Sequence, residues 1–485
     1  HEVVAICDPT LSPMSSAPAR ATPTSFCPIV REMSLRAAFP SRFLVPFRRL
    51  KLTLVGTIAA LALHVSVAPS PLRANDWPQF QGVERNNKSS ETALLAAWPS
   101  DGPNLAWTFK NAGVGYSSPA VVDGRIYLTG GREGRAELFC LDAQNGNELW
   151  SLPLNDKSFD FEGNSWGAGP RATVTVSDGL VYALAGDGKL VCATTAGEEQ
   201  WRLDMIGDLG GSIKNVDAGE PKTIGWGFCW GPMIDGGHLI CTPGSTDGAG
   251  LVVALNKANG EVVWRSKELN EESTYASPII ANIGGVKQYV AMTQFGVAAV
   301  AAKDGKLLWY YQRSRPYSDV VIPTPVCHED YVYASTGDGC DMIRVSKSEL
   351  GEFEVEAAYT SRNMKNSIGG FVLQDGYIFG TSERRGWVCQ DFLTGKIAWY
   401  QRANKSVGDG SVIFADGHLY LFGEKTAEVG LIEASADEWI EKGRFALPET
   451  SKLTPPSGRA WSRPVISDGM LYLRDQDLLF CYQVE

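Results

Sequence analysis

The sequence predicts an all-β protein, an eight-bladed β-propeller whose blades are four-stranded antiparallel sheets. Three observations support this fold class. A glycine is followed four residues later by a tryptophan in five places, turn glycines recur at a regular interval, and the last repeat lacks a strand that occurs as an orphan upstream of the first. A four-stranded sheet cannot bury both of its faces alone, so the copies must stack, and radial closure is the usual solution.

The five Gly-x-x-x-Trp copies mark the outer strand of a repeat. Each follows a short apolar run, which predicts the third strand, and the residues up to the tryptophan predict the fourth. Glycine suits the turn between them because it accepts the positive φ that a tight hairpin requires. The copies begin at Gly146, Gly197, Gly260, Gly305 and Gly395.

A second glycine marks the turn between the first two strands of each unit. The interval from Gly124 to Gly469 covers seven steps, or about 49 residues each. This interval and the absence of a Trp-Asp dipeptide disfavour a WD40 propeller. The predicted first strands begin near Pro119, Pro170, Pro232, Pro278, Pro325, Ile368, Ser411 and Pro464, which gives eight blades.

The ends of the repeat region predict how the ring closes. The last unit supplies three strands and stops at Glu485, while residues 104–110 form an orphan strand that carries Trp107. Joining the two completes the eighth blade and removes an exposed sheet edge, so Trp107 is expected in the same sheet as Phe480. The fifth and seventh units lack the Gly-x-x-x-Trp motif, and we expect their outer strands to be irregular.

Upstream of the propeller, which is assigned to residues 104–485, the sequence divides into three segments. Residues 1–32 show no periodicity and are expected to be non-native or unstructured. Residues 33–74 read as a signal peptide, with basic residues before the apolar run 52–67 and small residues up to Ala74. A membrane anchor is the alternative, although the run is shorter than the roughly 20 residues that span a bilayer. Residues 75–103 are expected to pack on the propeller as an N-terminal extension.

Charge and cysteine usage exclude several functions. The net charge is −11, and residues 1–74 hold eight Lys/Arg and three Asp/Glu, so the remainder carries −16. Such a chain repels phosphate backbones and anionic lipids, which excludes nucleic acid as an expected partner. No Cys-x-x-Cys occurs, which excludes ordinary zinc-ribbon and c-type haem signatures. No cysteine follows the signal segment directly, so no lipid anchor is expected, and no span is expected in the mature chain.

The segment from Ala254 to Trp264 resembles the tryptophan-docking repeat of quinoprotein dehydrogenases and of BamB-like envelope propellers, which runs Ala-x-Asp-x-x-Thr-Gly-x-x-x-Trp. The units ending at Trp150 and Trp399 are similar. The resemblance covers roughly residues 104–485, and Trp77-Pro-Gln-Phe is similar to the lead-in of PQQ-like repeat proteins. The resemblance implies the PQQ-like propeller fold and an exported, periplasmic or extracellular bacterial protein.

The first position of this repeat must be small because the indole of the fourth strand lies over it. A free cysteine acting as a compact apolar residue fits there. We therefore interpret Cys140, Cys389 and Cys481 as packing residues, with disulfide or reactive-thiol roles as alternatives. Cys229 and Cys241 are the pair to test for a disulfide.

Ligands of propellers usually lie over the central channel, where the first strands begin. Two arginines there could hold carboxylates, aromatic rings could stack on a planar ligand, and an aspartate could act as a base or cation ligand. This set suits PQQ with calcium; the alternative is that these side chains plug the channel or face solvent. The candidate cofactor-binding residues are Arg171, Trp230, Tyr275, Trp461 and Arg463, and the candidate catalytic residue is Asp409.

Departures from the dehydrogenase pattern decide between two functions. The sequence has no Cys-Cys pair, no long inserted loops and no fused haem segment. We therefore expect a non-catalytic binding or scaffolding protein of the cell envelope, with no cofactor and with a protein or polymer partner. The alternative is a PQQ-dependent quinoprotein oxidoreductase that acts on alcohols or sugars.

Overall fold

A computed structural model describes residues 75–156, 166–213, 216–217, 220–221, 226–318 and 320–485. The chain divides into two compact units, His1–Ser66 and Val67–Glu485. The first unit lies wholly outside the described residues, as do the upstream segment 1–32 and the signal segment 33–74. All structural statements below concern the second unit.

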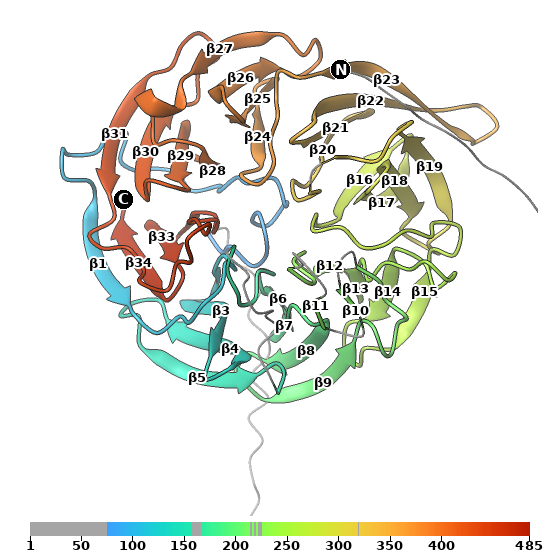
Figure 1. Ribbon diagram of the computed structural model, residues 1–485, viewed down its shortest axis with the longest axis horizontal. Helices are drawn as coiled ribbons and strands as arrows, with labels where there is room; N and C mark the ends of the chain where they lie inside the picture. The colour runs from blue at the N-terminus through green and yellow to red at the C-terminus, as the bar shows by residue number, and fades with distance from the viewer. Residues whose placement is uncertain (1–74, 157–165, 214–215, 218–219, 222–225, 319) are drawn as a thin grey trace, which may run out of the picture. The chain divides into compact units, whose positions relative to one another are not determined.

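The second unit contains eight four-stranded antiparallel sheets, as the repeats predicted, and we number these blades in chain order (Figure 1). Blades 1 to 4 comprise β2 (Ala120–Val122), β3 (Arg125–Arg132), β4 (Arg135–Asp142) and β5 (Glu148–Pro153); β6 (Thr175–Ser177), β7 (Leu180–Leu184), β8 (Lys189–Thr194) and β9 (Glu199–Asp204); β12 (Met233–Asp235), β13 (His238–Cys241), β14 (Val253–Asn256) and β15 (Val262–Arg265); and β16 (Ile279–Ile283), β17 (Val286–Thr293), β18 (Gly296–Ala301) and β19 (Leu307–Gln312).

Blades 5 to 8 follow the same order. They comprise β20 (Val326–His328), β21 (Tyr331–Thr336), β22 (Gly339–Lys347) and β23 (Phe353–Ser361); β24 (Phe371–Gln374), β25 (Tyr377–Ser382), β26 (Gly386–Asp391) and β27 (Ile397–Gln401); β28 (Gly410–Ala415), β29 (His418–Gly423), β30 (Glu428–Glu433) and β31 (Glu441–Ala446); and β32 (Val465–Ser467), β33 (Met470–Asp475), β34 (Leu478–Gln483) and β1 (Asn104–Phe109).

Two short elements stand outside the blades. They are the hairpin β10 (Val216–Asp217) with β11 (Glu220–Pro221), and the 3₁₀ turn η1 (Ala403–Lys405). Among the described residues, no helix combines the length and apolar character that crossing a bilayer requires.

The ring closes as the sequence predicted. Strand β1 pairs with β34, which places Trp107 opposite Cys481 and Thr108 opposite Phe480. The eighth blade is therefore shared by residues from both ends of the repeat region, and β1 covers the edge of β34 that would otherwise be unpaired.

In several blades the outer-strand indole packs on a turn glycine of the next blade. Trp150 lies opposite Cys140 in its own sheet, and its indole N–H donates to the carbonyl of Thr195 in blade 2 at 3.2 Å. A Cβ atom on Gly197 would stand 2.7 Å from the Trp150 ring, so only glycine allows this approach. The same arrangement recurs at Trp201, whose N–H donates to Lys257 at 3.1 Å.

The expectation of irregular outer strands in blades 5 and 7 is wrong. Strand β23 spans nine residues, and Tyr359 there lies against Gly395 of blade 6, in place of a tryptophan. In blade 7 the corresponding residue is Gly443, and Trp98 from the N-terminal extension packs against it, with its ring 5.3 Å from that of Phe445. Other aromatic residues therefore replace the missing indoles.

Residues 75–103 lie across the inner strands of several blades, and Figure 1 shows this blue segment crossing the middle of the ring. Trp77 exchanges two backbone hydrogen bonds with Val121 of blade 1, at 2.8 and 2.9 Å. Arg85 donates to the carbonyls of Gly231 and Pro232, just before blade 3, at 3.1 and 3.2 Å. The extension thus connects blades 1 and 3 across the middle of the ring.

Candidate functional site

A cavity of about 360 Å³ lies over the axis of the propeller. It is lined by residues that precede the first strand of every blade except blade 7. Phe80 of the extension and Glu383 of the β25–β26 turn complete the lining. Because first strands surround the axis, this is the mouth of the central channel. The lining residues before the first strands include Tyr116, Arg171, Trp226, Tyr275, Ile322, Ile368 and Trp461.

Aromatic side chains form two groups in the walls of this axial cavity. Trp461 lies between Tyr116 and Trp166, with ring centroids 5.1 and 6.1 Å away, and the two indoles are nearly parallel at 22°. Trp226 and Tyr275 form an edge-to-face pair at 5.4 Å. Flat apolar faces of this kind favour a planar or ring-shaped ligand.

Arg171 is held in place by its backbone neighbours and by a ring. Its guanidinium lies 4.8 Å from the centroid of Tyr116, and its terminal nitrogens donate to the carbonyls of Gly169 at 3.0 Å and Gly167 at 2.8 Å. These contacts fix a positive charge at the wall of the cavity, where it attracts an anionic group.

Phe80 of the extension lines the cavity, with Arg463 beside it. The Arg463 guanidinium lies 4.6 Å from the Phe80 ring centroid and donates to the carbonyl of Ile368 at 3.2 Å. Burial lowers the pKa of Arg463 to about 10. Sequence reasoning did not assign Phe80 to the site, although the motif that contains it was noted.

Two buried hydrogen-bond donors on lining residues have no partner among the described residues. They are Nε1 of Trp226 and Nε of Arg463. An unpaired buried donor costs about 1–3 kcal/mol, so a ligand that offers acceptor oxygens there would recover that energy.

The structure brings four of the six predicted site residues to the axial cavity: Arg171, Tyr275, Trp461 and Arg463. Trp230 is not among the lining residues. Its side chain is fully buried in the core between blades 2 and 3, and its indole N–H donates to Ser273 Oγ at 3.2 Å. Trp226, four residues earlier, faces the cavity instead.

Asp409 precedes blade 7, the blade that adds nothing to the cavity lining. Its Oδ1 atom is buried and has no hydrogen-bond partner among the described residues, and its carbonyl accepts the backbone N–H of Glu424 at 2.8 Å. Burial raises the pKa of the Asp409 carboxyl, and the Glu383 charge raises it further while Lys425 opposes this.

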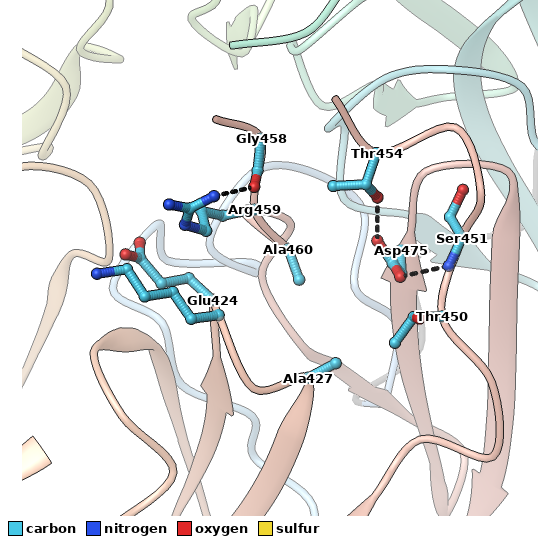
Figure 2. Close-up of a pocket in the computed structure, with 10 residues that line it drawn as sticks. Glu424, Ala427, Thr450, Ser451, Thr454, Gly458, Arg459, Ala460 and Asp475 are labelled. Atoms are coloured by element: carbon cyan, nitrogen blue, oxygen red, sulfur yellow. Dashed lines mark hydrogen bonds between the residues drawn. The ribbon is translucent and has the colours of Figure 1, made fainter. Parts of the chain in front are cut away.

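A second, polar pocket of about 390 Å³ lies behind Trp461, between blades 7 and 8 (Figure 2). Glu424 and Asp475 stand on opposite sides of it, and burial raises the pKa of both carboxyls. Glu424 Oε2 accepts the Trp461 indole N–H at 3.0 Å, and Asp475 accepts the backbone N–H of Ser451 at 2.8 Å. The polar pocket thus supports one wall of the axial cavity.

Metal and thiol chemistry have few candidate groups in the described part of the chain. No group of three or more His, Cys, Asp or Glu there is placed to hold a metal ion. Cys229 lines the axial cavity as a free thiol, and burial raises its pKa to about 12. Cys241 is also free, so the structure does not contain the disulfide that we proposed to test.

The comparisons with known proteins agree with this architecture. The model of a family described as "Outer membrane protein assembly factor BamB" matches residues 134–401, more than half of the chain. Among curated proteins, the serine/threonine-protein kinase AfsK of Streptomyces griseus is 26% identical over 196 residues, 40% of this chain. The match covers 21% of the kinase, so the chain spans about a fifth of that relative.

Several solved structures share the fold. BamB from Moraxella catarrhalis superposes with a TM-score of 0.51 at 14% identity, covering 76% of this chain and 94% of that one. Quinohemoprotein alcohol dehydrogenase from Comamonas testosteroni gives 0.54 at 12% identity, over 84% and 80% of the two chains. A europium-containing methanol dehydrogenase gives 0.58 at 11% identity, over 83% and 89%. The eight closed blades, the axial cavity and the family match together show that the chain belongs to the BamB-like family of PQQ-like β-propellers.

Proposed function

We propose that the chain is an exported, non-catalytic binding protein of the cell envelope that takes its partner at the axial cavity. The observation that carries this proposal is the lining of the cavity. Seven blades contribute to it, its walls are aromatic, and two buried donors on it have no partner in the described part of the chain. These are the features of a preformed recognition site.

Two further observations support the envelope and the scaffolding role. Residues 33–74 have the charge and hydrophobicity pattern of a secretory signal. The matching family is described as an outer membrane protein assembly factor. A protein or polymer partner is therefore the class of ligand that the proposal implies.

PQQ-dependent oxidation is the second candidate function. The aromatic walls, Arg171 and the unpaired donors of Trp226 and Arg463 suit a planar ring that carries carboxylates. The donor set does not suit the divalent cation that this chemistry implies, because Glu383 is the one carboxylate among the described lining residues and Asp409 lies outside the lining. The residues therefore fit the ring better than the metal.

One experiment separates the two functions. The purified protein is mixed with PQQ and calcium, and both the chromophore retained after gel filtration and dye-linked alcohol oxidation are measured. We expect no turnover above that of PQQ and calcium alone. Stoichiometric chromophore retention with turnover would establish the oxidoreductase and overturn the binding role.

A further inference from the structure

A group of basic side chains lies on the same end of blades 5 and 6 as the axial cavity, and we call it the basic arc. Its members come from the loops after β19, β23 and β27 and from the β25–β26 turn. All are exposed or partly exposed, and none forms an ion pair within the described residues. The basic arc consists of Arg315, Arg362, Lys365, Arg384, Arg385 and Arg402.

Backbone contacts make the basic arc continuous with the cavity. The backbone N–H of Glu383, which lines the cavity, donates to the carbonyl of Lys365 at 2.9 Å. A Cβ atom on Gly386 would stand 2.9 Å from the Arg402 carbonyl carbon, so the β25–β26 turn lies against Arg402. At the other end, Arg315 and Arg362 line a hollow of about 470 Å³.

The carboxylates near this hollow are already engaged by neighbouring groups. Asp338 accepts the backbone N–H of Ser318 at 2.7 Å and also its hydroxyl hydrogen bond. Asp341 lies 3.7 Å from the Arg313 guanidinium and accepts the Thr360 hydroxyl at 2.8 Å. The basic arc is thus a local positive surface on a chain with a net charge of −11, and it attracts anions.

The axial cavity adds a preference for rings. One face of a pyranose presents C–H groups, and stacking that face on an indole such as Trp461 buries apolar surface while the sugar hydroxyls stay at the edge. Glu383 offers an acceptor for hydroxyl donors, and Trp226 Nε1 and Arg463 Nε offer donors for ring or carboxylate oxygens. A carboxylated sugar supplies each of these complementary groups.

We propose, building on the binding function above, that the ligand is an acidic polysaccharide. One sugar ring stacks between the aromatic walls of the axial cavity, and the carboxylates of the following sugars lie along the basic arc. An acidic peptide would supply carboxylates for the basic arc, but its repeating unit has no ring that could stack on the aromatic walls. The sugar polymer supplies both the carboxylates and the rings.

The test uses three defined polymers with the full purified chain. Polygalacturonate fragments carry both rings and carboxylates, dextran carries rings alone, and polyglutamate carries carboxylates alone. We expect polygalacturonate to bind, with quenched tryptophan fluorescence and an affinity that falls as salt rises. Dextran and polyglutamate should each bind at least about tenfold more weakly, since each lacks one of the two contributions.

Variants locate the site. Trp461→Ala, and separately Trp166→Ala at a ring that is 38% exposed, should weaken polygalacturonate binding about five- to tenfold. The double variant Arg384→Ala/Arg385→Ala should weaken it about tenfold and flatten its salt dependence. Lys396→Ala is the matched control, because Lys396 lies exposed at the opposite end of β26, and it should bind as the wild type does.

Each other outcome overturns the proposal in a defined way. Polyglutamate binding that needs Arg384 and Arg385 but not Trp461 would assign the surface to an acidic protein segment. If dextran bound as tightly as polygalacturonate, the basic arc would have no part in recognising the ligand, and the proposal of an acidic polysaccharide would be wrong. No binding of polygalacturonate would reject the ligand class and leave the proposed binding role standing, since turnover with PQQ and calcium is what would reject that role.

Discussion

The indole Nε1 of Trp461 donates a 3.0 Å hydrogen bond to Oε2 of Glu424, and this bond joins the axial cavity to the polar pocket beside it. The ring that forms a wall of the first site is therefore oriented by a buried carboxylate of the second. A change of charge at Glu424 therefore affects both the axial cavity and the polar pocket.

Glu424→Gln should change how stability depends on pH. Burial raises the pKa of Glu424 above its usual value of 4.5, so the folded protein binds this proton more tightly than the unfolded chain does. Its contribution to stability is therefore lost as the pH rises from 4.5 through the folded pKa. We expect the variant, which keeps an acceptor for Trp461, to gain in unfolding free energy relative to wild type as the pH rises. Urea unfolding between pH 4 and 8 measures the unfolding free energy of both proteins. A difference between variant and wild type that stays constant over this pH range would contradict the prediction.

Trp107→Ala should destabilise the closed ring. The indole packs against Tyr472 at 6.1 Å and over Gly146 of blade 1, and its N–H donates to the Ala143 carbonyl at 3.1 Å. Loss of a fully buried indole costs about 3–5 kcal/mol in the unfolding free energy; because Trp107 is partly buried, denaturant unfolding should show a loss toward the lower end of this range. Leu350→Ala, at a side chain that is 89% exposed, is the control and should change stability little.

Gly443→Ala should also destabilise the protein. A Cβ atom there would stand 2.6 Å from Cβ of Trp98, whose backbone N–H is held by the Lys442 carbonyl at 2.9 Å. Because the Trp98 backbone cannot move away freely, we expect overpacking to lower the free energy of unfolding by about 1–3 kcal/mol. Thermal or denaturant unfolding measures this loss. Gly237→Ala, where an added Cβ meets nothing within 4 Å, should be tolerated. Equal effects of the two substitutions would show that the Trp98 contact does not constrain blade 7.

The cysteines beneath the outer indoles should be inert in the native protein. Cys140, Cys192, Cys389 and Cys481 are buried and free, and burial raises the pKa of each thiol to about 12. A chromogenic disulfide reagent at pH 8 should therefore react with them only after unfolding, because the thiolate is the reactive form. Rapid stoichiometric labelling of these four thiols in the folded protein would reject the packing interpretation.

The repeats made the ring predictable because each blade is built from local patterns. The turn glycines and outer indoles gave the number of blades, and the orphan strand with Trp107 gave the closure onto β34. The replacement of missing indoles by Tyr359 and Trp98 was not predictable in this way. Trp98 comes from outside the repeats, so no periodicity connects it with Gly443.

The site was predicted in outline from the positions just before first strands. Arg171, Tyr275, Trp461 and Arg463 reach the axial cavity for that reason. The sequence could not distinguish Trp226 from Trp230, because both precede the same strand and only the path of the chain before β12 decides which indole faces the axis. Phe80 was missed because its contact with Arg463 joins segments that lie far apart in the sequence.

The pairing of β1 with β34 also sets the order of assembly. During synthesis, the strand that carries Trp107 is made before the other seven blades, but β34, which it must meet, is made only after them. Seven blades can form from their own contiguous hairpins, whereas the eighth has to wait until β34 has been made. Because such a long-range contact forms slowly, the interval before closure is when the nascent chain is most exposed to mispairing with its neighbours.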